Sequence, residues 1–239
     1  MKVLLLGATG ATGRLVAQQL LERNIRVSVI VRAIERLDAS FTRDKRVTVI
    51  CADVFDLSVQ QLTHHLVDCE AVISCLGHNL SWQGVFGQPR NLVSGVLERV
   101  CLAIQTNPHS SPVKVILMSS SGVQNKQKEQ RTSWHYAIVN TILRVAIPPH
   151  RDNETAAWYL QNLSQSAKLA IEWVAVRPDT LTQHPTPTEY QLHRSVQFDP
   201  IFDAQQTSRG NVAHFMAELL TNASLWQHWK SHMPVIYNK

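Results

Sequence analysis

The sequence predicts an α/β domain with a doubly wound, mostly parallel sheet, and two observations carry this prediction. Short runs rich in Val, Ile and Leu alternate with longer amphipathic stretches along most of the 239 residues. Such alternation is typical of parallel strands that are buried on both faces and joined by right-handed helical crossovers. The chain also has no long Pro/Gly/Ser linker and no internal repeat, so residues 1–239 are expected to form a single domain.

Six strands and four helices are expected. The strands are the apolar runs at residues 2–8, 26–32, 47–53, 71–77, 114–120 and 171–178. The helices are the stretches at residues 13–23, 59–67, 90–105 and 153–167.

Two further segments do not fit the alternation. Residues 132–149 are apolar and roughly helical, and residues 183–206 are polar and irregular. Both follow the carboxyl ends of expected strands, where open α/β sheets bind ligands. Residues 132–154 and 183–206 are therefore expected to contribute a substrate pocket. The apolar part would equally suit core cover or a dimer contact, so a homodimer stays open.

The charge distribution argues against several partners. Residues 1–50 hold 9 Lys and Arg against 4 Asp and Glu, and the rest of the chain holds 14 of each. An excess confined to one segment favours a local anionic ligand over nucleic acid. No run of 18 apolar residues is present, so neither a membrane-spanning helix nor a membrane partner is expected.

The N-terminus and the cysteines indicate the compartment. Residues 1–7 are too short for a signal peptide and are interpreted as a strand. The four cysteines show neither a CxxC pair nor a metal-ligand spacing, so no metal site is predicted. They are expected to be buried, reduced thiols of a cytoplasmic protein: Cys51, Cys69, Cys75 and Cys101.

A glycine-rich turn opens the chain. Gly7, Gly10 and Gly13 follow an apolar strand and begin an amphipathic helix. Gly7 would permit the tight turn, Gly10 would let the backbone approach a pyrophosphate, and Gly13 would let the helix pack on the strand. In this context the spacing predicts a dinucleotide-binding Rossmann fold, and a purely structural turn is the alternative.

The end of the second strand indicates which dinucleotide binds. Binders of NAD usually place a carboxylate there for the ribose 2′-hydroxyl, whereas this strand ends at Arg32, with Arg36 four residues further on. A guanidinium suits a 2′-phosphate, and Arg14 would assist from the glycine turn. The sequence therefore predicts NADP(H) in preference to NAD(H), the alternative being that these arginines are solvated surface charges.

Two further strand ends are interpreted as cofactor contacts. Asp53 is placed to accept a hydrogen bond from the adenine amino group while Val54 covers the ring, although Asp53 would also suit a turn or helix cap. Gly77 would let the backbone lie close to a ribose and phosphate. Cys75 is interpreted as a small core residue, because no positive group is visibly paired with it.

With these motifs, the chain resembles the atypical short-chain dehydrogenase/reductase family in its NAD(P)H-binding branch. It is most similar to the flavin/biliverdin reductase-like and NmrA-like members. The resemblance spans nearly the whole chain, and its most specific part is the GATGATG form of the glycine turn. It rests on residues 7–14, 31–32, 36–37, 52–54, 71–77, 115–121 and 174–178, followed by Leu181.

The resemblance implies a role for each matching position. The pyrophosphate would be cradled by the glycine turn, namely Gly7, Thr9, Gly10, Ala11, Thr12 and Gly13. Arg32 would bind the 2′-phosphate, Asp53 and Val54 the adenine, and Leu76 and Gly77 the ribose. Ser119, Ser120 and Pro178 would lie near the nicotinamide.

One part of the family pattern is missing. Many members use a YxxxK pair in which the Lys lowers the Tyr pKa, so that the phenol can transfer a proton. None of the four tyrosines here is followed four residues later by Lys. Ordinary alcohol–ketone chemistry with a Tyr acid is therefore not expected.

Three proton sources remain. Hydroxyls of Ser119 and Ser120 would orient a substrate carbonyl, or would only satisfy turn backbone. His150 titrates near neutrality and would donate a proton, while Arg151 would hold an anionic substrate. The neighbouring Asp152 and Glu154 are interpreted as capping the start of their own helix. In the third case water supplies the proton and the protein only orients the reactants.

These observations favour one function and leave two alternatives. The first is an NADPH-dependent oxidoreductase that transfers hydride to a small planar, carbonyl or quinone-type acceptor without a Tyr–Lys pair. The second is a non-catalytic NADP(H) sensor that signals through a partner. A nucleotide-sugar epimerase or dehydratase is least favoured, because such enzymes generally need the Tyr–Lys pair and a larger C-terminal region.

Overall fold

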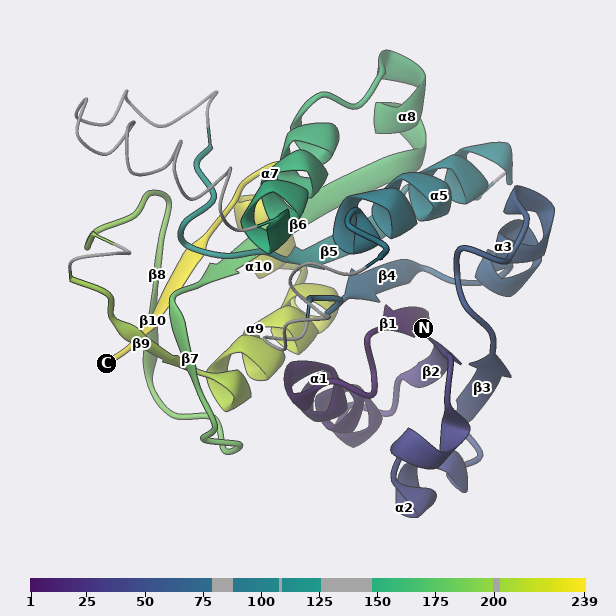
Figure 1. Cartoon of the computed structure of the whole chain (residues 1–239), viewed down its shortest axis with the longest axis horizontal. Helices are drawn as coiled ribbons and strands as arrows, with labels where there is room; N and C mark the ends of the chain where they lie inside the picture. Colours follow the sequence, from purple (N-terminus) through teal and green to yellow (C-terminus); the bar gives the residue numbers. More distant parts are fainter. Residues whose placement is uncertain (79–87, 108, 126–147, 200–202) are drawn as a thin grey trace.

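The computed structural model describes residues 1–78, 88–107, 109–125, 148–199 and 203–239. Its main sheet has eight strands in the order β3-β2-β1-β4-β5-β6-β10-β8 (Figure 1). The strands of this sheet are β1 (Lys2–Leu6), β2 (Arg26–Val31), β3 (Val47–Cys51), β4 (Ala71–Ser74), β5 (Val113–Met118), β6 (Ile171–Pro178), β8 (Tyr190–His193) and β10 (Val235–Asn238). Strands β7 (Thr180–Thr182) and β9 (Gln206–Ser208) form a separate parallel pair.

Helices cover both faces of the sheet. One face carries α3 (Val59–Leu66), α5 (Leu92–Thr106), α7 (Pro148–Gln161) and α8 (Gln165–Ala170). The other face carries α1 (Ala11–Glu22), α9 (Arg209–Thr221) and α10 (Ala223–Trp229). A short 3-10 turn, η1 (Ile34–Arg36), and the single-turn helix α2 (Ala39–Thr42) connect β2 to β3. Among the described helices, none is long and apolar enough to cross a membrane.

The strand order places the ligand-binding edge of the sheet. All neighbouring strands from β3 to β10 run parallel, and only β8 is antiparallel. The chain moves outward from β1 in one direction through β2 and β3, and then in the other through β4, β5 and β6. The resulting switch point lies between β1 and β4, and crevices at the carboxyl ends of strands beside such a point bind ligands. This order confirms the predicted doubly wound, mostly parallel Rossmann fold.

Periodicity explains why the elements form where they do. In β1 the residues Val3–Leu6 are all almost fully buried, as expected for a central strand with helices on both faces. The inward stripe of α1 consists of Thr12, Gly13, Val16, Ala17 and Leu20, which recur at helical spacing. Helix α3 begins with a capping box between Ser58 and Gln61.

Several expectations about the elements are wrong. The helix expected at 153–167 is two helices, because α7 ends at Gln161 and Ser164 caps a new helix by accepting a hydrogen bond from Ala167. Segment 183–206 is not wholly irregular, since it contains β8 and the start of β9. Strand β3 is an edge strand of only partly buried residues, and Cys51 at its end is exposed rather than buried. Of the predicted pocket segment 132–154, residues 132–147 lie outside the described residues, and the rest begin α7.

The last forty residues complete the sheet and one layer of the core. Strand β10 pairs with β6 in parallel and with β8 in antiparallel register, extending the sheet beyond the six expected strands. Trp226 and Trp229 of α10 are 1% and 4% exposed and belong to the core on the same face as α1 and α9. These tryptophans therefore pack α10 into that core.

Candidate functional site

The glycine turn between β1 and α1 has the sterics that the sequence predicts. Gly7 has φ +80°, and a Cβ on it would lie 2.6 Å from the Cys75 carbonyl oxygen. A Cβ on Gly13 would overlap the Gly7 carbonyl oxygen, so only glycine lets α1 start this close to the turn. The Gly10 N–H donates to the Gly7 carbonyl at 2.9 Å and closes the turn. The exposed Gly10 and the first turn of α1 thus stand at the carboxyl end of β1.

A cavity of about 350 Å³ opens beside this turn. It lies at the carboxyl ends of β1, β2, β3 and β4, the edge that the strand order marks as ligand-binding. We call it the nucleotide cleft. Its lining comes from the glycine turn, the ends of β2, β3 and β4 and the start of α5: Gly7, Thr9, Gly10, Ile30, Val31, Arg32, Arg36, Ala52, Asp53, Val54, Cys75, Leu76, Gly77, His78, Gln88, Pro89, Leu92 and Val96.

The cleft brings together most of the residues predicted to hold a cofactor. Nine of them line it: Gly7, Thr9, Gly10, Arg32, Arg36, Asp53, Val54, Leu76 and Gly77. Ala11, Thr12 and Gly13 lie just beyond it in the first turn of α1. Among the described residues, no atom would lie within 4 Å of a Cβ on Gly77, so the backbone there is not crowded by them. The residues present therefore fit an elongated nucleotide along the strand ends.

Positive charge concentrates at the β2 end of the cleft. The Arg32 side chain is 66% exposed, and its Nη1 lies 3.8 Å from Oδ2 of Asp53, which is a weak ion pair. The Arg36 side chain is also exposed and lines the same wall. Asp53 uses its other oxygen, Oδ1, to accept the Phe55 N–H at 2.9 Å. Asp53 thus caps a turn, as the alternative interpretation holds, and still borders the cleft.

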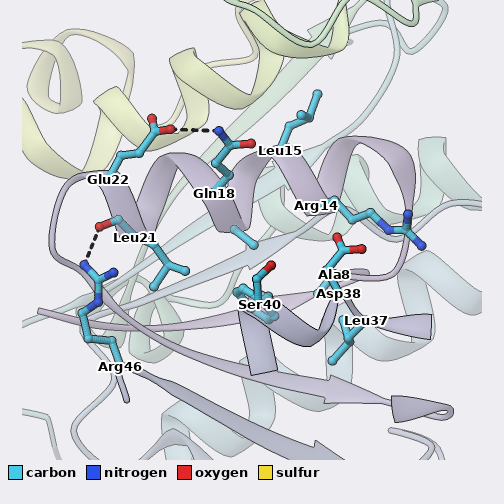
Figure 2. A pocket seen from close by; sticks show the side chains of 12 residues that line it. Ala8, Arg14, Leu15, Gln18, Leu21, Glu22, Leu37, Asp38, Ser40 and Arg46 are labelled. Atoms are coloured by element: carbon cyan, nitrogen blue, oxygen red, sulfur yellow. Dashed lines mark hydrogen bonds between the residues drawn. The ribbon is translucent and has the colours of Figure 1, made fainter. Parts of the chain in front are cut away.

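Unlike most of the other residues predicted to bind the cofactor, Arg14 does not line the nucleotide cleft. Its Nη2 donates to the Arg36 carbonyl oxygen at 3.0 Å, and the side chain lines a second cavity of about 550 Å³. Figure 2 shows that this second cavity lies between α1 and the segment that carries Leu37, Ser40 and Arg46. The glycines of the turn do not line it. Although larger, it is separate from the strand ends, and Arg14 supports the position of η1 from this side.

On the opposite side of the nucleotide cleft, a buried cluster joins the starts of α5 and α7. Asp152 is 4% exposed and lies in the first turns of α7. Its carboxylate accepts the N–H groups of Val93 and Ser94 at 2.7 and 3.0 Å and the Ser94 hydroxyl at 2.5 Å. It also lies 2.8 Å from Nε2 of His78, which lines the cleft. We call this cluster of His78, Val93, Ser94 and Asp152 the α5–α7 junction.

The junction corrects the interpretation of Asp152 as a cap on its own helix. The carboxylate caps α5 instead, where it satisfies two N–H groups that have no partner within that helix. Burial by itself would raise the pKa of Asp152. Hydrogen bonds from His78, Ser94 and the two backbone N–H groups outweigh that effect and lower the pKa. The carboxylate is therefore ionised at neutral pH, so His78 Nε2 donates the hydrogen bond and the imidazole is held in one orientation.

The predicted catalytic residues lie just after β5 and in the first turn of α7. Ser119 is 8% exposed, and its hydroxyl has no hydrogen-bond partner among the described residues. Ser120 accepts the Gly122 N–H at 3.3 Å. A Cβ on Gly122 would lie 3.4 Å from the His150 ring and 3.7 Å from the Ser120 hydroxyl, so these groups share one small region.

The other residues predicted near the nicotinamide are His150, Arg151 and Pro178, and they differ in burial and in their contacts. Nε2 of His150 lies 3.8 Å from the Glu154 carboxylate, so Glu154 faces His150 across one helical turn. Arg151 is exposed, and its side chain is not among those that line the cleft. Pro178 is buried at the end of β6, and its carbonyl accepts the Ser121 N–H at 2.9 Å.

The described tyrosines are unsuited to act as acids. Burial raises the pKa of Tyr159 to about 12 and that of Tyr190 to about 12, and it also raises the pKa of Tyr237. A catalytic tyrosine needs the opposite shift. Tyr136 lies outside the described residues. Cys75 is likewise a core thiol, because burial raises its pKa to about 12.

Two residues at the site have no signal in the sequence analysis. His78 follows Gly77 directly, but its importance depends on Asp152, 74 residues later. Arg209, the first residue of α9, donates to the Thr12 hydroxyl at 2.9 Å beside the glycine turn. Both residues stand near the end of a strand or at the start of a helix, which could have suggested them as site residues. Neither, however, is part of a recognisable sequence motif.

A family model described as NAD(P)H-binding matches residues 7–223. No curated protein sequence matches the chain. Solved structures do match over its whole length. An oxidoreductase from Lactococcus lactis has a TM-score of 0.70 at 17% identity, covering 100% of this chain and 91% of that chain.

Two further structures are similar to the same extent. A short-chain dehydrogenase/reductase (wide type) from Veillonella parvula, in complex with NADP, has a TM-score of 0.69 at 15% identity, covering 99% of this chain and 94% of its own. An anaerobillin reductase from Escherichia coli O157:H7 has a TM-score of 0.68 at 17% identity, covering 100% and 97%. At such identities the structures show a shared fold, whereas the family model covers most of the chain by sequence. The chain therefore belongs to the NAD(P)H-binding family, and it shares its fold with these three structures.

Proposed function

We propose that the protein is an NADPH-dependent oxidoreductase that reduces a small planar, carbonyl or quinone-type acceptor without a Tyr–Lys pair. The observation that carries this proposal is the pair of exposed guanidinium groups, Arg32 and Arg36, on one wall of the nucleotide cleft. A 2′-phosphate between them would accept charge-assisted hydrogen bonds, which a 2′-hydroxyl accepts far more weakly. Membership of the NAD(P)H-binding family and the fold shared with a structure that holds NADP support the proposal.

The residues of the cleft would divide the binding among them. N–H groups of the glycine turn and of the first turn of α1 would hold the diphosphate. Val54 would cover the adenine, and Asp53, although it caps a turn, retains Oδ2 for the adenine amino group. Leu76 and Gly77 would lie along a ribose. When bound, NADPH would supply the hydride from its nicotinamide.

The acceptor would then lie near Ser119, Ser120 and His150. The unpartnered Ser119 hydroxyl would orient an acceptor oxygen, and His150 would hold the proton that follows the hydride. His78, oriented by Asp152, would position the cofactor end of the site. For a flavin-like acceptor, water would suffice as the proton source, and the protein would act chiefly by orientation.

Calorimetric titration with NADPH, NADP⁺, NADH and NAD⁺ tests the proposal, followed by an acceptor screen. The screen contains flavins, quinones, dicarbonyls and aldehydes. We expect NADPH to bind more tightly than NADH, and Arg32→Ala to weaken NADPH binding by about tenfold or more while leaving NADH nearly unchanged.

Arg43→Ala is the matched control. Arg43 is an exposed arginine of the same basic segment, but it does not line the cleft. The Arg43→Ala substitution should not alter the preference for NADPH over NADH. Equal affinity for NADPH and NADH would contradict the cofactor assignment. Tight NADPH binding without turnover of any acceptor would contradict the reductase and favour the NADP(H) sensor.

A further inference from the structure

Helices α1 and α9 lie side by side on one face of the sheet (Figure 1). Two contacts show that they run in the same direction. At the start of both helices Arg209 donates to the Thr12 hydroxyl at 2.9 Å, and at their ends Arg23 pairs with Glu218 at 2.7 Å. Each helix N-terminus carries a partial positive charge of about half a unit. The first turns of α1 and α9 therefore form one electropositive region beside the glycine turn.

Arg209 adds a full positive charge to this region, which is an unfavourable place for it. A cation in the first turn of a helix opposes the helix dipole, and here two such dipoles point at it. Its Nε is buried and has no hydrogen-bond partner among the residues that the structure describes, and its Nη1 donates to the Thr12 hydroxyl. Burial lowers the pKa of Arg209, as expected for a charge that loses solvation.

The two ends of the helix pair differ in how their cations are neutralised. Arg23 is bonded to the Glu218 carboxylate through both Nε and Nη2. In the described part of the chain, Arg209 forms no ion pair. Arg209 is partly buried, and a partly buried cation without an anionic partner is less stable than a paired one, so a ligand with negative charge is favoured beside it. An anion would complete this end of the helix pair.

We propose that Arg209 is a second cationic arm of the cofactor site and binds the diphosphate of the dinucleotide against the first turn of α1. The inference rests on the proposed binding of NADP(H) in the nucleotide cleft. The diphosphate of a dinucleotide lies at the N-terminus of the first helix in this fold. Thr12 stands in that first turn, and its buried hydroxyl holds the Arg209 guanidinium beside α1. Neither residue lines the nucleotide cleft, so the guanidinium would approach the diphosphate from the α9 side of the turn. Arg32 would then bind the 2′-phosphate of the cofactor, and Arg209 would bind its diphosphate.

The arrangement also links the C-terminal region to the cofactor. Arg209 follows Ser208, which caps α9 and ends β9. Strand β9 pairs with β7, which lies just after β6. Neutralising Arg209 with a diphosphate would therefore stabilise the start of α9 and the segment attached to it.

Two nucleotides that differ in the diphosphate test the inference. NADP⁺ has both the 2′-phosphate and the diphosphate, whereas 2′-AMP has only the 2′-phosphate. We expect Arg209→Gln to weaken NADP⁺ binding by about tenfold or more, in calorimetry, and to leave 2′-AMP binding unchanged. Arg32→Ala should weaken both. Arg23→Gln is the matched control, because it removes a cation from the same helix pair far from the turn, and it should change neither affinity.

The outcomes separate this inference from the function on which it rests. If Arg209→Gln binds NADP⁺ as tightly as the wild type while Arg32→Ala does not, Arg209 is a structural tether and the inference is wrong. If the wild type binds neither nucleotide, the proposed cofactor itself is wrong. Equal loss of NADP⁺ and 2′-AMP affinity in Arg209→Gln would also overturn the inference, because it would indicate general damage to the cleft.

A measurement on the wild-type protein covers the case in which Arg209→Gln does not fold. Phenylglyoxal modification of Arg209, followed by mass spectrometry of the peptide that contains it, reports access to the guanidinium. NADP⁺ should slow this modification and 2′-AMP should not. Equal rates with and without NADP⁺ would overturn the inference.

Discussion

The glycine turn and the α5–α7 junction border the same nucleotide cleft, but they are built in different ways. The turn takes its shape from the consecutive residues 7–13, where missing side chains let the backbone of three elements come together. The junction takes its shape from one carboxylate, Asp152, which binds groups up to 74 residues away in the sequence. The turn therefore depends on volume and backbone conformation, and the junction depends on charge and hydrogen bonding.

This difference explains how each region fails. Adding a single carbon at Gly7 or Gly13 would force backbone atoms apart. Removing one charge from the junction would leave buried donors without partners, whereas the turn has no charge to remove. Substitutions of the two kinds should therefore have different effects in the two regions.

The largest effect is expected for Asp152→Ala at the junction. It leaves the N–H groups of Val93 and Ser94, the Ser94 hydroxyl and His78 Nε2 without their acceptor. Removing one member of such a buried charged network costs about 3–5 kcal/mol. Urea denaturation measures the loss. The matched control is Asp53→Ala, which removes a half-buried turn cap and should cost about 1 kcal/mol. Similar losses in both variants would contradict the importance of the junction.

A smaller loss is expected for Gly13→Ala in the turn. The added Cβ would overlap the Gly7 carbonyl oxygen, and relieving the overlap by backbone movement costs about 1–3 kcal/mol. The variant should also lose dinucleotide affinity, because the first turn of α1 shifts. Gly77→Ala is the matched control for stability, since its Cβ would meet no atom of the described part of the chain within 4 Å.

Together the two glycine variants separate steric roles in the fold from contacts with a ligand. Gly77→Ala should melt like the wild type and still bind dinucleotide more weakly, because the methyl group enters the cleft. Melting temperature and calorimetry measure the two properties separately. An unchanged melting temperature for Gly13→Ala would contradict the steric argument for the turn.

The smallest effect is expected from acid, which acts on the junction and not on the turn. The pKa of Asp152 is lowered from its ordinary value of 3.8. The stability that it provides is complete above its unfolded pKa and is lost as the pH falls through its folded pKa. The urea concentration at the unfolding midpoint should therefore decrease as the pH is lowered below about 4. The fall should be shallower in Asp152→Asn, which has no carboxylate to protonate. Equal slopes in wild type and Asp152→Asn would show that Asp152 is not the group responsible.

A second buried carboxylate should act in the opposite direction and serves as a control. Asp179 is 8% exposed just after β6, and burial raises its pKa. Its contribution to stability is present below its unfolded pKa and is lost as the pH rises through its folded pKa, so it partly offsets the acid loss. Asp179→Asn should therefore steepen the decline in acid. The same urea midpoints measure this change, and a shallower decline would contradict the assigned direction.

The sequence by itself determined the features that depend on neighbouring residues. The six expected strands are short runs rich in apolar residues, and the structure has all six, with boundaries that differ mainly at the carboxyl ends. Only the edge strand β3 is not buried. The glycine turn was predictable because the positive φ of Gly7 and the close approach of Gly13 to Gly7 are set within seven residues, although Gly7 also packs against the backbone of Cys75. Arg32 and Arg36 were predictable as cleft residues because strand ends in this fold meet at one edge.

Only the tertiary structure decided the features that depend on contacts between distant segments. Asp152 has the residue type and the sequence position of a cap for its own helix. No neighbouring residue in the sequence indicates that it caps α5 instead. Arg209 looks like an ordinary polar start of a helix until Thr12, 197 residues earlier, is placed beside it. Patterns of polarity report which face of an element is buried, but not which other element covers it. That choice is made by the packing of the whole sheet and its two helical layers.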